Sequence, residues 1–146
     1  MAPPPATLPA LLRDLPQWFW DVPWDADRYP GNVDRSALAL GGDDNFFAYT
    51  VLEHYGFHIP DLRSAELWLD NDATIVVLEP RALDIAMFHD REQAYGAHVG
   101  VMVSETEVVH LCKEVGTPTV WTLEQFATTP RYHHLVGFRR PQLAVA

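Results

Sequence analysis

Apolar residues that alternate with small or polar ones predict two neighbouring strands in the second half of the chain. Within 97–103, Val99, Val101 and Val103 alternate with small or flexible residues, which is typical of a half-buried strand. A polar turn over 104–107 separates this strand from an apolar stretch over 108–112. The pattern therefore predicts a β-hairpin that brings His98 and His110 close together across one sheet.

Two helices are predicted before this hairpin. Residues 43–45 carry carboxyl or amide side chains, which are favoured at a helix N-terminus. Over 46–52 the apolar residues then recur with helical spacing. Gly56 is placed to end this helix as a C-terminal cap. A second, shorter helix is predicted over 64–69.

The remaining apolar stretches predict further strands. A β-branched run over 73–78 predicts a buried strand. Further strands are predicted over 83–88 and 135–140, and 120–123 begins either a strand or a helix. A helix followed by several antiparallel strands is typical of an α+β domain, in which the helix packs against a curled antiparallel sheet.

The N-terminal stretch has a different composition. Residues 1–9 hold four prolines and are expected to form an extended arm. Three tryptophans then lie between residues 18 and 24, and they either form an aromatic wall for a ligand or partner or pin the N-terminus onto the core. We therefore divide the chain into an N-terminal extension, 1–35, and a domain, 36–142.

Composition excludes several classes of partner. At 146 residues and 48% hydrophobic content, the chain is expected to form one folded domain. Its net charge of −10 disfavours nucleic acid and anionic membranes, which bind through Lys and Arg. A single cysteine excludes an internal disulfide. With no signal-peptide pattern and no apolar run of about 18 residues, a cytoplasmic protein is expected.

The histidine hairpin resembles a known family. A strand that reads His-Val-Gly, with a second histidine twelve positions on, is similar to the NlpC/P60 group of papain-like cysteine peptidases. Residues 83–88 resemble the family's Gly-Asp-Leu-apolar-apolar-Phe strand. Residues 43–60 resemble its Asp-Cys-Ser-Gly-Phe/Leu helix, which ends in Gly-Ile-x-Leu-Pro. The resemblance covers roughly 41–140 and implies a papain-like NlpC/P60-type fold.

The resemblance fails at the nucleophile. The family's catalytic cysteine falls on Asp44, or on Asn45 if the register slips by one residue, and neither residue supplies a thiol. The resemblance implies that His98 is the base and His110 the group that orients it. A carboxylate is a poor nucleophile toward an amide, so the family's usual catalysis is not expected here.

Four uses of Asp44, His98 and His110 remain open. The site is degenerate, or it performs general acid–base chemistry, or it binds a metal such as Zn or Fe, or it recruits Cys112 from the same strand face as His110. A lone cysteine in an apolar strand is usually a buried hydrophobe, and no tight metal-ligand spacing is present. The degenerate site is therefore preferred, with no metal and no cofactor.

Two functions follow from these alternatives. The first is a non-catalytic binding or assembly protein, a pseudoenzyme whose partner is another protein or a small-molecule or peptide ligand. The second is a repurposed enzyme of hydrolase type that uses the three residues for acid–base chemistry on an amide or small molecule. An open cleft favours the enzyme, and a side chain that fills the cleft favours the binding protein. The candidate binding residues are Trp18, Trp20, Trp24 and Phe46.

Overall fold

A computed structural model describes residues 8–144, and the expected N-terminal arm falls largely on residues outside this range. The helices are α1 (Asp44–His54), α2 (Ser64–Leu69) and α3 (Leu123–Ala127). Single turns of 3-10 helix cover Ala10–Asp14, Gln17–Asp21, Leu38–Leu40 and Pro130–Tyr132. The strands are β1 (Thr74–Val77), β2 (Ile85–His89), β3 (His98–Met102), β4 (Glu107–His110), β5 (Thr119–Thr122) and β6 (His134–Pro141).

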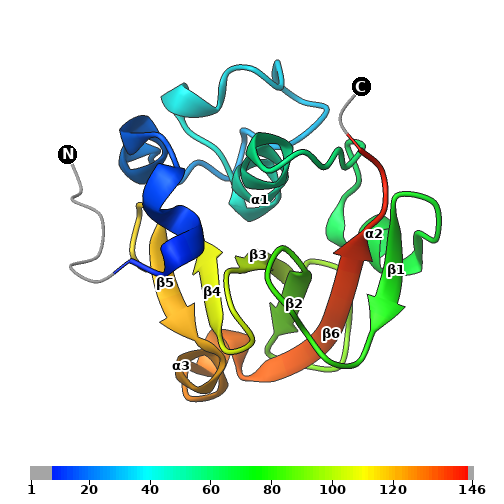
Figure 1. Ribbon diagram of the computed structural model, residues 1–146. Helices are drawn as coiled ribbons and strands as arrows, with labels where there is room; N and C mark the ends of the chain where they lie inside the picture. The colour runs from blue at the N-terminus through cyan, green and yellow to red at the C-terminus, as the bar shows by residue number, and fades with distance from the viewer. Residues whose placement is uncertain (1–7, 145–146) are drawn as a thin grey trace.

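The six strands form one antiparallel sheet in the order β1-β6-β2-β3-β4-β5 (Figure 1). The α+β class expected from the sequence is confirmed. The predicted histidine hairpin is also present as β3 and β4, with Val101 opposite Val109. Residues 120–123 prove to contain both predicted elements, since β5 runs directly into α3.

Alternate residues of the sheet enter two separate cores. On β2, Ile85 and Met87 join the core that contains α1, while Ala86 and Phe88 join a smaller core around Phe126 of α3. This is the period-two pattern of a strand that is covered on both faces. Figure 1 shows α1 above the sheet and α3 at its lower end in that view.

Helix α1 forms where the sequence predicts it. The Asp43 side chain accepts a hydrogen bond from the Phe46 backbone N–H at 2.9 Å, which is an N-cap that stabilises a helix by about 1 kcal/mol. Gly56 lies just beyond the helix with φ +95°, a conformation that glycine adopts without strain. The helix packs against β3 and β4. Among the described residues, no helix is long and apolar enough to cross a membrane.

Strand β1 differs from its prediction. It forms within 73–78, but it lies at the edge of the sheet, where β6 is its one partner among residues 8–144. Ile75 and Val76 are 42% and 53% exposed, so the expectation of a buried strand was wrong. β-branched residues favour the extended backbone whether or not the strand is covered. The β-branched composition of 73–78 therefore predicted the strand correctly but not its burial.

The described part of the N-terminal extension, 8–35, packs into the same core as α1. Leu12, Phe19 and Trp20 are buried there. The Tyr55 hydroxyl at the end of α1 donates to the Leu11 carbonyl at 2.6 Å. The aromatic stretch thus pins the N-terminal segment onto the body of the protein.

Candidate functional site

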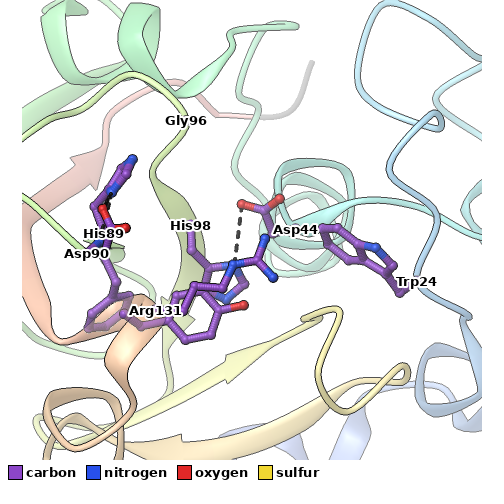
Figure 2. A pocket seen from close by; sticks show the side chains of 9 residues that line it. Trp24, Asp44, His89, Asp90, Gly96, His98 and Arg131 are labelled. Carbon is purple, nitrogen blue, oxygen red and sulfur yellow. Dashed lines mark hydrogen bonds and ion pairs between the residues drawn. The ribbon is translucent and has the colours of Figure 1, made fainter.

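Asp44, His98 and His110 meet at one end of the sheet. Asp44 is the first residue of α1, His98 the first of β3 and His110 the last of β4. His98 Nε2 lies 2.9 Å from His110 Nδ1, and His98 Nδ1 lies 3.6 Å from Asp44 Oδ2. Figure 2 shows the Asp44 and His98 side chains pointing toward one another. The sequence therefore identified three residues that the fold brings together from three elements.

A backbone hydrogen bond fixes the Asp44 carboxyl. The Val99 N–H donates to Asp44 Oδ2 at 2.8 Å, which ties the start of α1 to β3. Asn45 turns elsewhere, and its side-chain amide lies 3.3 Å from the Tyr49 hydroxyl inside the protein. Of the two residues left open by the sequence, Asp44 faces His98.

Gly100 makes the histidine pair possible. A Cβ atom at this position would lie 2.5 Å from Val108 Cγ1 and 3.2 Å from His110 Cβ. Real Cβ atoms do not approach other atoms as closely as the first of these distances, so any side chain at residue 100 would push β4 outward. The glycine of the His-Val-Gly sequence thus lets His110 reach His98.

Aromatic rings enclose both histidines. The Tyr132 ring lies 4.5 Å from the His98 ring between centroids. Trp121 and Phe126 lie 4.5 Å and 4.6 Å from the His110 ring. This enclosure removes the histidines from water, and burial penalises a charged imidazole.

Burial moves the pKa values of all three residues toward their neutral forms. It lowers the pKa of His98 to about 3 and that of His110 well below its usual value. Burial, together with the neighbouring charge of Asp43, raises the pKa of Asp44 to about 8. At pH 7 the site therefore contains two neutral imidazoles and a carboxyl that is mainly protonated.

One proton arrangement fits these charges. A protonated Asp44 can offer its hydrogen to His98 Nδ1, and His98 Nε2 can then donate to His110 Nδ1. That leaves the proton of His110 on Nε2, a buried atom with no hydrogen-bond partner among the described residues. At 3.6 Å the first contact is longer than a hydrogen bond, a spacing that is common at catalytic groups before a substrate binds.

The site opens on a cavity of about 190 Å³. Asp44 and His98 line it, whereas His110 is fully buried behind His98. Phe46 does not fill the cavity, because it is buried in the α1 core. The other lining residues are Trp24, Phe88, His89, Asp90, Gly96, Arg131 and Tyr132. In the view of Figure 2, Trp24 stands at one end, and His89 and Asp90 stand at the other.

Two residues that line the cavity, Arg131 and Tyr132, leave no signal in the sequence. Arg131 Nη1 pairs with Glu114 Oε2 at 2.9 Å, and the Tyr132 hydroxyl donates to the other Glu114 oxygen. These residues come from a turn before β6 and a loop after β4. No spacing in the sequence links them to the histidine hairpin, because the sheet order brings them together.

The structure corrects two of the four candidate binding residues. Trp20 is 1% exposed and Phe46 is 0% exposed, so both belong to the core and neither offers a binding surface. Trp24 lines the cavity, and Trp18 is 41% exposed on the surface. Large aromatic rings close to the chain start contribute mainly to burial here.

The metal and thiol alternatives gain no support from the geometry. The described residues include no group of three or more His, Cys, Asp or Glu side chains that could hold a metal ion. Cys112 lies in the smaller core with Phe126 and does not line the cavity. Burial raises the pKa of its thiol, which disfavours the reactive thiolate.

No protein-family model matches the chain, and no curated protein matches it. The similarity to the NlpC/P60 group stays a prediction from the residues quoted above.

Proposed function

We propose that this protein is an enzyme whose cavity is a general acid–base site, with Asp44 as the group that exchanges protons with a small amide-type substrate. One observation carries the proposal. His110 is buried, both ring nitrogens of His98 face protein groups, and Asp44 lines an open cavity beside them. Asp44 is therefore the member of the three best placed to meet a bound molecule.

The raised pKa of Asp44 suits this role. A carboxyl that titrates near neutral pH can give a proton and take it back during one reaction cycle. Because His98 and His110 are neutral, neither imidazole adds a positive charge that would favour the ionised carboxylate of Asp44. They act as positioning residues, since His98 faces Asp44 and His110 fixes the orientation of the His98 ring.

Amide hydrolysis illustrates the proton balance. Asp44 gives its proton to the carbonyl oxygen, and the resulting carboxylate takes a proton from the water that adds to the carbonyl carbon. Asp44 then protonates the nitrogen as the C–N bond breaks, and a hydroxyl proton of the intermediate returns to the carboxylate. A carboxylic acid and an amine leave, and Asp44 is protonated again, so no thiol is needed.

The proposed family resemblance supports the same reading. In the NlpC/P60 pattern the reactive group begins a helix, the base begins a strand and the orienting group lies on the next strand, which is the order of Asp44, His98 and His110 along this chain. We propose a divergent NlpC/P60-like domain in which a carboxyl stands at the nucleophile position. With its single cysteine, the chain also suits a reducing compartment, and we propose the cytoplasm.

A second candidate is a non-catalytic binding or assembly module. The hydrogen bond from Val99 to Asp44 favours it, because a carboxyl that joins α1 to β3 needs no chemical role to explain its presence. In such a module the cavity would hold a ligand without changing it. The exposed Trp18 would be its candidate contact with a protein partner.

A substrate screen with matched variants separates the two candidates. Wild type, Asp44→Asn and Asp90→Asn are incubated with a library of small amides and peptides, and turnover is followed by NMR. Asp90 is the control because it lines the same cavity but pairs with Arg91, which holds its pKa well below the usual value.

The acid–base proposal requires a substrate whose turnover falls at least about 100-fold in Asp44→Asn and stays within a few fold in Asp90→Asn. Turnover that is unchanged in Asp44→Asn would overturn the role of Asp44. If nothing in the library is turned over but a compound binds in the cavity, the binding module becomes the better account.

A further inference from the structure

Arg131 stands out among the groups at the cavity. Among the described residues that line it, Arg131 is the one with a permanent positive charge. Its Nη1 pairs with Glu114 Oε2 at 2.9 Å, and no other hydrogen bond of its guanidinium occurs within residues 8–144. The side chain is 54% exposed. Several of its N–H groups are thus available to a molecule in the cavity.

The position of this guanidinium is fixed by its neighbours. Glu114 holds it through one oxygen and accepts the Tyr132 hydroxyl with the other. Tyr132 in turn packs on the His98 ring. In Figure 2 the Arg131 side chain extends past His98 toward Asp44, and the charge of Asp44 is among the causes that raise the pKa of Arg131. Arg131 and the proposed proton donor therefore face the same space.

The other charge on the cavity wall is already compensated. Asp90 lies 2.7 Å from Arg91 Nε and 2.8 Å from His89 Nδ1. Arg91 donates to both carboxylate oxygens of Asp90, at 2.7 Å and 3.2 Å, so this negative charge is paired. Arg131 is then the charged group of the cavity wall that has donors to offer. An anionic group of a ligand would be attracted to this end of the cavity.

We propose that Arg131 binds a carboxylate of the substrate, so that the substrate class is a small amide that carries a carboxylate on a short apolar stem packed near Trp24. The amide group of this substrate class rests on the proposed function, whereas the carboxylate rests on the residues that line the cavity. A planar guanidinium matches a carboxylate with two parallel hydrogen bonds. A phosphate dianion would need further cations, which a chain of net charge −10 does not supply at this cavity.

The state of Asp44 is compatible with a bound anion. As a neutral carboxyl it does not repel a nearby anion, whereas an ionised Asp44 would repel the anion and pair with Arg131 itself. Carboxylate binding should therefore weaken as pH rises through about 8, where Asp44 ionises. The charged or titratable groups near Asp44 are Asp43, Tyr49, Arg63, His98 and Arg131.

Calorimetric titration with benzoate and its neutral isostere benzamide tests the inference. Wild type, Arg131→Gln and Arg131→Lys are compared with Arg81→Gln, a control that removes an arginine lining a different cavity. We expect wild type and Arg81→Gln to bind benzoate at least 10-fold more tightly than benzamide at pH 6.5. Arg131→Gln should lose this preference, and Arg131→Lys should keep part of it. Circular dichroism establishes that each variant is folded.

Two results would overturn the inference: equal affinity of wild type for benzoate and benzamide, or a benzoate preference that survives in Arg131→Gln. Inorganic phosphate that binds more tightly than benzoate would overturn the choice of a carboxylate. If wild type loses benzoate affinity above pH 8 and Asp44→Asn does not, the result would further support carboxylate binding beside Asp44. These titrations measure binding and need no turnover. Arg131 can therefore prove to bind a carboxylate even if Asp44 catalyses no reaction, and Asp44 can prove catalytic even if Arg131 binds no carboxylate.

Discussion

The Val99 backbone N–H donates to the Asp44 carboxyl at 2.8 Å, which places the first residue of α1 directly beside the strand that begins with His98. This single contact has two consequences. It docks the helix on the sheet, and it holds a carboxyl in a buried position next to two neutral histidines. The same bond therefore links the stability of the fold to the protonation of the site.

Stability should depend on pH through Asp44. Its pKa is about 8 in the folded protein against 3.8 for an exposed carboxyl, so the native state binds more protons than the unfolded state between these values. The stabilisation is fully present below pH 3.8 and is lost as pH rises toward 8. Urea unfolding at several pH values should show wild type losing stability relative to Asp44→Asn across this window, by up to about 1.4 kcal/mol per pH unit.

The comparison with Asp44→Asn is informative because asparagine keeps an oxygen that can accept the Val99 N–H. A difference in unfolding free energy that stays flat or grows in favour of wild type between pH 4 and 8 would contradict the raised pKa. Asp43 contributes a slope of the same sign, since burial raises its pKa to about 6.

Gly100→Ala should damage the site through packing alone. The added methyl group would overlap Val108 and press on His110, and overpacking of this kind costs about 1 to 3 kcal/mol. Thermal unfolding measures the loss, and the imidazole NMR signals of His98 and His110 report the displaced ring.

Gly116→Ala is the control for this change. Its Cβ would meet no atom within 4 Å, although its φ of +87° makes alanine strained. Some loss of stability is expected there, but the histidine signals should not move. Unchanged signals in Gly100→Ala would show that the glycine has no part in bringing the histidines together.

The proton arrangement of the histidine pair is directly measurable. We expect ¹⁵N NMR at pH 7 to find both rings neutral, with the proton on Nε2 in each. His110→Phe should remove the acceptor of His98 Nε2 and shift the His98 signals, while His134→Phe on β6 should leave them in place. A His98 ring protonated on Nδ1 would mean that Asp44 is ionised and would reverse the proposed direction of proton donation.

The sequence predicted those parts of the site that depend on local pattern. His98 and His110 lie on a hairpin whose alternation fixes the register, so their proximity follows from the strands themselves. Asp44 follows from the N-terminal signal of a helix. Its contact with Val99 does not, because it depends on how α1 docks on the sheet.

The rest of the site depends on contacts between distant elements. Arg131 and Tyr132 reach the cavity because β6 pairs with β2 and because Glu114 holds them, and neither fact leaves a pattern near residue 131. Burial was also hard to predict for single residues. Trp20 and Ile75 are both apolar, yet the first is buried in the core and the second lies exposed on an edge strand.

A titration of the Asp44 carboxyl by ¹³C NMR tests the central claim most directly, because a proton donor at neutral pH is what the proposed chemistry requires. The side-chain carboxyl signal is assigned by its absence in Asp44→Asn and followed from pH 3 to 10. We predict a midpoint near pH 8. A midpoint at or below about 4, the range of an exposed aspartate, would show that Asp44 is ionised at neutral pH and would contradict the account.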